Sequence, residues 1–447
     1  MPLYSQFSDA LTVHLAGVHS LLVGFSGGLD STVALHLAQR YATQHDLALR
    51  AIHINHGLQE QAGEWQLHCQ QQAKLLDAKF LAEQVSIQKA PRQSLEALAR
   101  DARYHSFAQH LQSDELLITA HHGDDQLETL LLNLKRGSGV NGLAAMPVSR
   151  PFAANKLVRP LLGFSRKQLE GYAQRHKLSW VEDPSNQSDE FDRNFLRQQV
   201  IPLFSDRWPQ FLSNSCRSIE LLQEAQSLNQ DLATIDLQQC MQQGALLCDE
   251  VLSLSTPRQN NLLRYWLNQQ GWSYPSAAQL SELRSQLEAR ADAKMAVSME
   301  QGELRRFRGR LYAVPTVLLQ QPADPLTWDI ATQPQLRFAH GGLLDCFEGG
   351  NLLPPEGQVV TIRFRHQVDN LLFDALERSG RRNLKKLLQE ADISPWQRAR
   401  IPLVFYGDEL VAIAGCYSSR TWQSMPGAGI GFRWTDACPD RATGQPD

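Results

Sequence analysis

Short apolar runs alternate with amphipathic stretches through the first part of the chain. Residues 21–25 form an apolar run, and residues 32–41 repeat apolar side chains with helical spacing. The same pattern predicts further strands at 49–54 and 116–119 and helices at 63–76, 94–111 and 125–134. This alternation is typical of βαβ units, so we expect an α/β fold with a parallel sheet covered on both faces. Ligands of such sheets bind beyond the carboxyl ends of the strands.

The pattern changes near Pro202 and Trp208-Pro209, where we expect the first domain to end. The predicted organisation is a first domain at 1–213, a mixed middle domain at 214–320, a linker with short strands at 321–358, a third domain at 359–435 and a polar tail at 436–447. The middle domain should hold a connecting helix at 213–237, helices at 256–269 and 276–289, and strands at 294–299, 303–308 and 310–314. The third should hold a strand at 359–364, a helix at 384–390 and a hairpin of 403–405 with 410–413.

Composition favours a globular chain of two or three domains, because 43% of its 447 residues are hydrophobic and 20% are charged. No apolar run reaches the roughly 18–20 residues that span a bilayer, and the first twenty residues lack the pattern of a signal peptide. The seven cysteines are scattered without a Cys-x-x-Cys pair, which disfavours disulfides, zinc sites and iron–sulfur clusters. We therefore expect a cytoplasmic protein.

Positive charge is concentrated locally, although the net charge is −4. Residues 135–197 carry 11 Lys and Arg against 6 Asp and Glu, and residues 363–400 carry 9 against 5. Residues 303–310 hold four arginines around a single acid. Such zones suit a bound polyanion, because contacts with phosphates need only local charge. The alternative for each zone is solvated surface charge.

The segment Ser26-Gly27-Gly28-Leu29-Asp30-Ser31 joins the first predicted strand to the first predicted helix. Its two glycines let the backbone approach an anion, which the N–H groups at the helix start would hold. The serine hydroxyls add donors, and the aspartate could hold Mg²⁺ that neutralises phosphate charge. There is no Gly-x-x-x-x-Gly-Lys-Ser/Thr, so the usual loop for γ-phosphoryl transfer is missing. An ordinary glycine turn before a capped helix is the alternative.

A second polar segment follows the strand predicted at 116–119. His121, His122, Asp124, Asp125 and Glu128 bring two imidazoles and three carboxylates to a strand end and a helix start. This set could bind Mg²⁺ and perform acid–base chemistry. Part of its acidity could instead cap the helix, because Asp125 and Glu128 have the spacing of a capping box.

Paired cations flank these segments. Arg100 and Arg103 lie on one helical face and could bind phosphate or carboxylate, or pair with neighbouring acids. Lys135-Arg136 ends a predicted helix before a glycine-rich loop, so it could touch a large substrate or simply match the helix dipole. Arg193 and Arg197 lie one helical turn apart.

Taken in order, these segments resemble the tRNA(Ile)-lysidine synthases of the ATP-pyrophosphatase, or PP-loop, superfamily. The resemblance is carried by SGGLDS (26–31), HINHGL (53–58), EALARDARY (96–104), ITAHHGDDQLETLLLNLKRGSG (118–139), VRPLL (158–162) and DPSN…DRNFLR (183–197). Residues 380–390 and 395–403 resemble the C-terminal domain of the longer bacterial form. One departure is Gln59, where the family often has arginine. The resemblance implies a Rossmann-like PP-loop ATPase domain followed by two smaller α+β C-terminal domains.

The activity implied by this resemblance is ATP-dependent ligation of free lysine to C2 of the wobble cytidine in the CAU anticodon of an isoleucine tRNA. An adenylated cytidine would be the intermediate, and lysidine, AMP and pyrophosphate the products. No membrane and no protein partner are required, and a homodimer is left open.

The resemblance also implies roles for individual residues. ATP would be bound by Ser26, Gly27, Gly28, Leu29, Asp30, Ser31 and His53, with Mg²⁺ held by Asp30 and Asp125. The catalytic set would be Asp30, His122, Asp124, Asp125, Glu128, Arg100, Arg103, Arg193 and Arg197. The tRNA would be bound by Lys135, Arg136, Arg305, Arg306, Arg381, Arg382, Lys385 and Lys386.

Two other functions fit parts of the sequence. A tRNA thiolase of the same superfamily would adenylate a pyrimidine oxygen and deliver sulfur, but it would typically carry paired cysteines, and Cys69 is alone in the first domain. An inactive RNA-binding scaffold could keep the fold, although the intact Asp30 and the full acidic segment argue against it.

Overall fold

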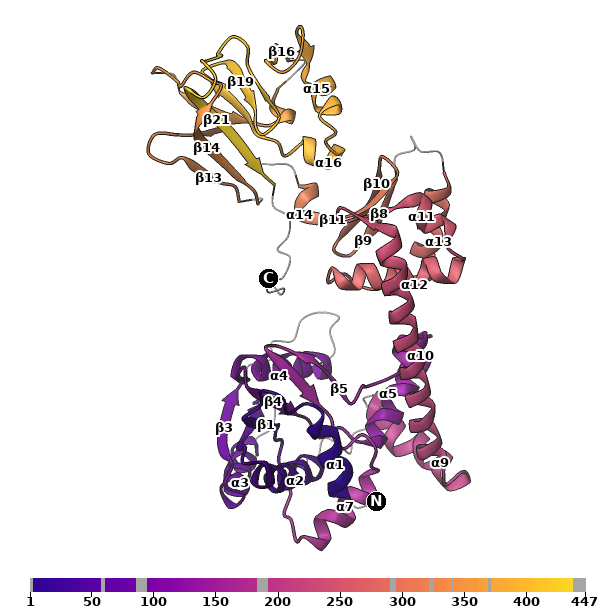
Figure 1. The fold of residues 1–447 in the computed structure, drawn as a ribbon. Coiled ribbons are helices and arrows are strands. Elements are labelled where there is room, and N and C mark those ends of the chain that lie inside the picture. Colours follow the sequence, from indigo (N-terminus) through magenta and orange to yellow (C-terminus); the bar gives the residue numbers. More distant parts are fainter. Residues whose placement is uncertain are drawn as a thin grey trace. The chain divides into compact units, whose positions relative to one another are not determined.

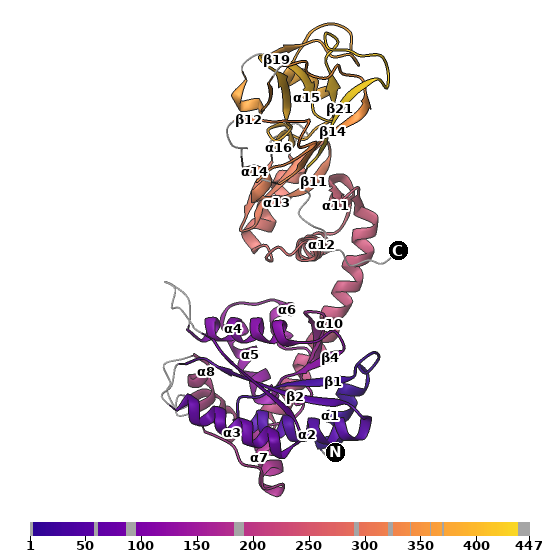
Figure 2. The same cartoon turned by 90° about the vertical axis from the view of Figure 1, so that its left-hand side faces the viewer.

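A computed structural model of this chain describes residues 3–57, 61–85, 95–182, 192–289, 295–320, 325–339, 341–357, 359–368 and 371–436 (Figures 1 and 2). The chain divides into two compact units, residues 1–229 and residues 230–447. The predicted features at Leu58-Gln59 and Asp183–Asn186, and the tail beyond Asp436, lie outside the described residues.

The first unit is built on a six-stranded sheet in the order β3-β2-β1-β4-β6-β5, in which only β5 runs antiparallel to its neighbour. Its strands are β1 (Ser20–Gly24), β2 (Ala48–Asn55), β3 (Lys79–Gln84), β4 (Glu115–Ile118), β5 (Ser149–Phe152) and β6 (Asn155–Val158). Its helices are α1 (Leu3–Thr12), α2 (Leu29–His45), α3 (Ala62–Leu75), α4 (Leu95–His110), α5 (Gly123–Lys135), α6 (Val140–Leu143), α7 (Arg166–Arg175), α8 (Asp192–Phe195), the π-helix η2 (Leu196–Val200), α9 (Ile201–Arg207) and most of α10 (Phe211–Cys240).

The central strand β1 is apolar throughout because both faces of the sheet are covered. Leu21 and Val23 pack into one core with α1, α2, α3 and α7, whereas Leu22 packs into a second core with α4. All three side chains are fully buried. Such a continuous run is expected for a parallel strand with no face in water.

The order of the strands fixes where a ligand can bind. From β1 the chain moves outward to β2 and β3, then returns to place β4 on the other side of β1. The connections after β1 and β4 therefore leave in opposite directions, and a crevice opens between them at the carboxyl edge of the sheet. The predicted fold class is confirmed, and the turns after β1 and β4 are the two segments that the sequence marked as chemical.

Some elements of this unit escaped prediction for physical reasons. The edge strand β3 has no buried residue among its six, so its apolar pattern is weak. Strands β5 and β6 are four residues each, too short for a clear alternation.

The second unit is antiparallel. Its first part contains a five-stranded sheet made of β7 (Met241–Gln242), β8 (Ala245–Leu247), β9 (Ala296–Met299), β10 (Gly302–Phe307) and β11 (Arg310–Pro315). The helices of this part are α11 (Cys248–Ser253), α12 (Thr256–Gln269), α13 (Ala277–Glu288) and α14 (Thr316–Leu319). Further along are β12 (Leu326–Thr327), β13 (Gln335–Arg337), β14 (Leu343–Gly350), β15 (Val360–Arg363), β16 (Leu372–Phe373), β17 (Arg382–Asn383), β18 (Leu403–Tyr406), β19 (Glu409–Ile413), β20 (Tyr417–Ser418), β21 (Gly429–Thr435), the 3-10 helix η3 (Arg365–Gln367), α15 (Leu384–Glu390) and α16 (Pro395–Arg398).

The described part of 321–358, the stretch expected as a linker with short strands, holds β12, β13 and β14. It contains β14, which pairs with β21 near the end of the chain, and it contributes the buried side chains of Trp328 and Leu352 to the C-terminal core. The partner strand lies about eighty residues away in sequence, so local composition could not reveal the pairing.

Across the described part of the chain, no helix combines the length and apolarity that a membrane crossing needs.

Candidate active site

The glycine-rich turn between β1 and α2 forms an anion cradle. Gly27 has a φ of +85°, and a Cβ there would lie 2.7 Å from the Sγ atom of Cys69, so a side chain would be both strained and obstructed. Gly28 is the N-cap of α2. The hydroxyl oxygens of Ser26 and Ser31, which flank the turn, lie 3.0 Å apart. Leu29 is buried, so only its backbone is available to a ligand. The unpaired N–H groups at the start of α2 suit a phosphate or pyrophosphate.

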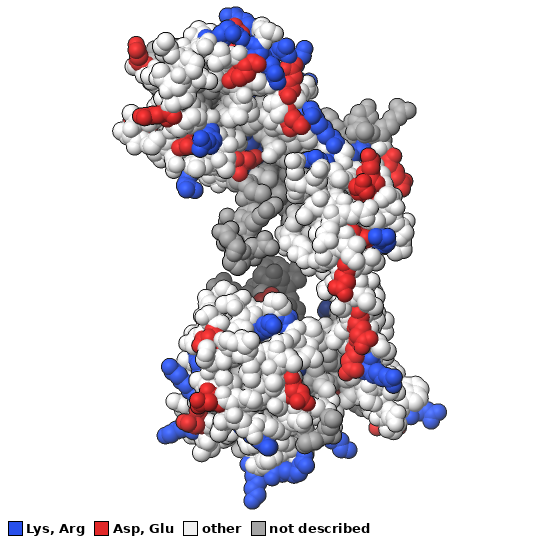
Figure 3. All heavy atoms as spheres, viewed as in Figure 1, with Lys and Arg blue, Asp and Glu red and all other residues white. Residues whose placement is uncertain are grey.

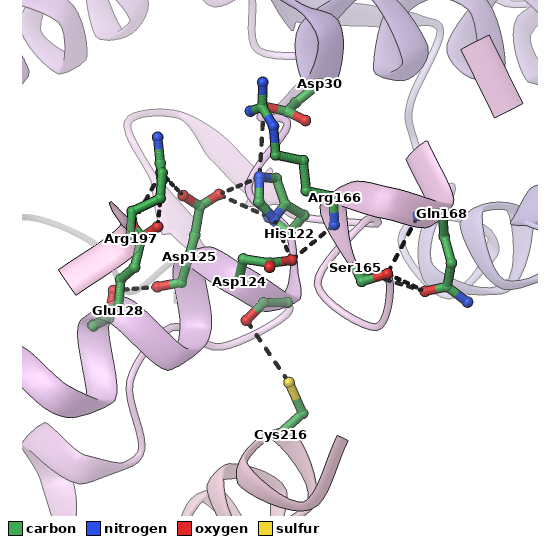
Figure 4. A network of polar contacts seen from close by, with 12 residues as sticks. Asp30, His122, Asp124, Asp125, Glu128, Ser165, Arg166, Gln168, Arg197 and Cys216 are labelled. Carbon is green, nitrogen blue, oxygen red and sulfur yellow. Dashed lines mark hydrogen bonds and ion pairs between the residues drawn. The ribbon is translucent and has the colours of Figure 1, made fainter. Parts of the chain in front are cut away.

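His122 lies among three carboxylates at the start of α5 (Figure 4). Its Nε2 atom is 3.5 Å from Oδ2 of Asp30 and 3.5 Å from Oδ2 of Asp125. Its Nδ1 atom is 3.4 Å from Oδ2 of Asp124. One buried imidazole thus joins the turn after β1 to the turn after β4.

The charges in this cluster stabilise one another. Burial alone would lower the pKa of His122, but the three carboxylates outweigh burial and raise the pKa to about 10. Burial would raise the pKa of Asp125, yet His122, with His121 and Arg197, holds that pKa below its usual range. The pKa of Asp124 is lowered as well, because the contact with His122 and the hydrogen bond from the Arg166 backbone outweigh its burial. At neutral pH the imidazolium of His122 therefore faces the ionised carboxylates of Asp124 and Asp125.

Asp125 also caps α5, as the sequence allowed. Its Oδ2 atom accepts a hydrogen bond of 3.0 Å from the backbone N–H of His122. Glu128 has a different role, because its side chain is fully buried against two arginines. The Nε atom of Arg197 lies 2.7 Å from Oε1 of Glu128, and the Nε atom of Arg193 lies 3.2 Å from Oε2. Burial raises the pKa of Glu128 in spite of these cations.

A cavity of about 400 Å³ opens beside this cluster. The predicted residues that line it are Ser26, Gly28, Asp30, Ser31, His53, Arg100, Arg103 and Asp125. The lining does not include His122, Asp124, Glu128, Arg193 or Arg197, which lie behind it or beside it. His53 is fastened at the end of β2, where its Nδ1 atom is 3.0 Å from the carbonyl oxygen of Phe25. The structure therefore separates groups that face the cavity from groups that support them.

Sequence reasoning missed Arg166, the first residue of α7. Its guanidinium Nη1 atom is 3.2 Å from Oδ2 of Asp30, and its backbone N–H donates a hydrogen bond of 2.8 Å to Oδ2 of Asp124 (Figure 4). The only local signal is the capping box of Ser165 and Gln168 that begins α7. Nothing local shows that this helix start docks against α5, where Gly123 N–H donates to the carbonyl of Phe164.

The further residues that line the cavity, for which no role was predicted, include His56, Trp65 and Tyr104. The Nε2 atom of His56 lies 3.4 Å from Nη2 of Arg103. Burial, with the nearby charges of Arg103 and His53, lowers the pKa of His56 to about 4. His56 belongs to the HINHGL segment, so its position after β2 was the signal that could have identified it.

The predicted tRNA-binding cations fall into two groups. Several are engaged within the protein: Lys135 with Asp192 at 2.8 Å, Arg305 with Glu303 at 2.8 Å, Arg306 with the carbonyls of Leu287 and Ala289, and Arg382 with both oxygens of Glu390 at 2.5 and 2.6 Å. The others, Arg136, Arg381, Lys385 and Lys386, are exposed. None of these four has an ion pair with another described side chain. Figure 3 shows Lys and Arg side chains gathered over the part of the second unit where α15 and β16 lie.

The donor set beside the cradle suits a hard divalent cation. The Oδ1 atom of Asp30 is buried and has no hydrogen-bond partner, and Asp125 contributes a second carboxylate across His122. Among the described residues no group of three or more protein ligands is gathered. Mg²⁺ usually takes only one or two carboxylates and completes its shell with water and substrate phosphates, so two aspartates beside an anion cradle fit it.

Comparison with known proteins covers both units. Residues 4–204 match a family described as a PP-loop domain, residues 246–312 a TilS substrate binding domain, and residues 360–434 a TilS substrate C-terminal domain. The chain is 42% identical to the tRNA(Ile)-lysidine synthase of Serratia proteamaculans over 428 residues, covering 95% of this chain and 97% of that relative. It is 41% identical to the enzyme of the same name from Pectobacterium atrosepticum over 420 residues, covering 93% and 94%. A solved structure, the U34-tRNA thiolase NcsA of Methanococcus maripaludis, aligns with a TM-score of 0.42 at 15% identity over 49% of this chain and 79% of that one.

Proposed function

This chain belongs to the tRNA(Ile)-lysidine synthase family, and we propose that it joins the ε-amine of free lysine to C2 of the wobble cytidine in a CAU anticodon. It is a ligase that forms a carbon–nitrogen bond, uses ATP and acts on tRNA(Ile). The observation that carries the detailed proposal is the meeting of the anion cradle and the His122 cluster at the switch point of the sheet.

The first chemical step activates the base. The C2 carbonyl of cytidine is urea-like and a poor electrophile, so its oxygen must first become a leaving group. Attack of O2 on the α-phosphorus of ATP forms a bond to AMP and releases pyrophosphate. The N–H groups at the start of α2 and the hydroxyls of Ser26 and Ser31 would hold the departing pyrophosphate, where negative charge accumulates.

Asp30 and Asp125 would hold Mg²⁺ at this site, with the buried Oδ1 atom of Asp30 as the group that lacks a partner. When bound, the ion neutralises phosphate charge. Arg166 contributes a further positive charge, since its guanidinium lies 3.2 Å from Asp30 near the cradle.

The second step replaces AMP by lysine. The ε-amine attacks C2, the C2–O2 bond breaks, and AMP leaves with that oxygen. Lysine arrives as an ammonium ion, so it must be bound and must give up a proton, to a carboxylate of the site or to water, before it attacks. Asp125 is suited to bind the ammonium because it lines the cavity and stays ionised. Asp124 and Glu128 lie outside the lining, and we assign them to holding His122, Arg193 and Arg197 in position.

The substrate base must leave the anticodon stack to reach this cavity, as in other enzymes that modify bases. Binding of the tRNA body is assigned to the basic surfaces of the second unit, with Arg381, Lys385 and Lys386 as the exposed cations of α15 and its surroundings. His53 and the end of β2 would lie beside the adenosine.

Incorporation of labelled lysine tests the proposal. An unmodified tRNA(Ile) transcript with a CAU anticodon is incubated with the protein, ATP and labelled lysine, and an elongator methionine tRNA serves as the control. We expect ATP-dependent labelling of the isoleucine tRNA alone. Pyrophosphate release on another tRNA without lysine incorporation would retain the adenylating chemistry and overturn the choice of acceptor.

A further inference from the structure

Two arginines contact one aromatic ring at the edge of the cavity, and a third arginine lies close to both of them. The guanidinium carbon of Arg100 lies 5.0 Å from the centre of the Tyr104 ring, and that of Arg150 lies 5.4 Å from it. Arg159 follows β6 and is 3% exposed. Burial lowers its pKa against the opposing effect of Tyr104, and the charges of Arg150 and Arg100 lower it further, so the three cations lie close enough to repel one another.

No described carboxylate forms an ion pair with any of these three arginines, in contrast to Arg193 and Arg197. Arg159 donates from Nη1 to the carbonyl of Pro147 at 2.8 Å, but its Nε atom is buried without a hydrogen-bond partner. Like charges gathered at a partly buried place, with a donor left unsatisfied, cost folding free energy. An anionic ligand would remove that cost.

Topology explains why the cluster lies at the ligand edge. Because β5 runs antiparallel, it begins where β6 ends, and Ser149 is the register partner of Val158. Arg150 near the start of β5 and Arg159 after the end of β6 therefore reach the same carboxyl edge as the cradle. Arg100 and Tyr104 approach from α4 and line the cavity itself.

We propose that Arg100, Arg150 and Arg159 form a second phosphate site, which holds a backbone phosphodiester of the RNA next to the nucleotide whose base enters the cavity. This inference rests on the proposed function. The cradle after β1 is assigned to the phosphates of ATP, whereas the three arginines come from α4, from β5 and from the residue after β6. A nucleotide drawn out of a strand carries a phosphodiester on each side of its ribose, so negative charge must lie at the rim of the cavity. Guanidinium groups bind phosphate oxygens in a planar, two-pronged way that suits this position.

Binding of RNA by full-length variants tests the site. The probe is the unmodified anticodon stem-loop of tRNA(Ile) with the CAU anticodon, and its affinity is measured over a series of salt concentrations without ATP or lysine. Arg150→Glu is the main variant, and Arg159→Lys keeps the charge while removing the planar fork. Lys156→Glu is the matched control, because Lys156 is an exposed lysine on the same hairpin. Arg150 pairs with Leu157 in the sheet, so these two side chains lie on one face and the neighbouring Lys156 lies on the other.

We expect Arg150→Glu to weaken stem-loop binding about tenfold at low salt and to reduce the salt slope by about 1, as loss of one phosphate contact does. Arg159→Lys should weaken binding severalfold, and Lys156→Glu should change it by about twofold or less. The KM for ATP should be unchanged in all three.

Wild-type affinity and salt slope in Arg150→Glu would overturn the proposal, and so would equal loss in Lys156→Glu. Loss of ATP affinity with normal stem-loop binding would overturn the RNA assignment, because the phosphate would then belong to the nucleotide. Failure of the wild-type protein to ligate lysine would refute the proposed function instead, since the binding measurement needs no catalysis.

Discussion

The two units of this protein use arginine and lysine in different ways. In the first unit, Arg193 and Arg197 are partly buried against Glu128, and the charge of Arg197 helps to keep Asp125 ionised. In the second unit the exposed cations of α15, Lys385 and Lys386, lie in water without a described partner, while Arg382 is engaged by Glu390. The difference shows that a basic residue in a motif is not by itself a ligand contact. Its carboxylate partner decides whether it supports the protein or is free for RNA.

Removal of the Asp125 charge in the first unit should have the largest effect on the rate of lysine incorporation. In Asp125→Asn the side chain keeps its shape but no longer balances His122, whose pKa is about 10, and cannot bind the lysine ammonium. We expect single-turnover lysine incorporation to fall by roughly 100-fold or more, the usual range for loss of one electrostatic contact in an active site. Asp206→Asn, an exposed acid on α9, is the matched control and should retain activity. Near-wild-type incorporation by Asp125→Asn would contradict the assignment.

Charge reversal in the second unit should separate binding from folding. Lys385→Glu with Lys386→Glu is expected to weaken tRNA binding roughly tenfold to 100-fold at low salt and to leave the KM for ATP unchanged, because only phosphate contacts are lost. Arg382→Glu should instead lower the free energy of unfolding by about 1–2 kcal/mol, because it replaces the Nη1 donor that contacts both oxygens of Glu390 with a second carboxylate. Filter binding and urea unfolding distinguish the two. If the lysine reversal lowers stability as much as the arginine reversal does, the contrast between free and engaged cations is wrong.

The smallest predicted effect concerns His56 at the cavity. Its pKa is about 4 when folded and about 6.5 when unfolded, so the unfolded chain binds more protons between these values. Stability is therefore lost as the pH falls from about 6.5 to 4. The full difference between the folded and unfolded pKa values corresponds to about 3 kcal/mol of folding stability. Partial exposure of the ring reduces the expected loss of stability to about 1–2 kcal/mol.

His56→Gln should remove that part of the acid sensitivity, because glutamine does not titrate. The check is urea unfolding at pH 7 and pH 5 for both proteins. The variant should lose less stability than wild type between the two values, and an unchanged pH dependence would mean that His56 is already protonated or exposed in the folded state.

Strong local signals account for what could be predicted. The helix predicted at 256–269 matches α12, and the one at 384–390 matches α15, because each combines clear apolar periodicity with a recognisable start. The hairpin of β18 and β19 was visible from two apolar runs around a Gly-Asp turn. In contrast, β14 could not be assigned from its surroundings, because its stability comes from pairing with β21.

The sequence alone determined the fold class, the family and the two segments that carry the chemistry, because each depends on residues close together in the chain. A glycine turn after an apolar strand and a run of acids at a helix start are both local patterns. Only the tertiary structure decided which side chains meet. In the folded chain Arg166 contacts Asp30, and Glu128 is buried against Arg193 and Arg197. Arg100, Arg150 and Arg159 lie close together and form no ion pair with a described acid. These contacts join elements whose order in the sheet differs from their order in the sequence, so no local pattern could reveal them.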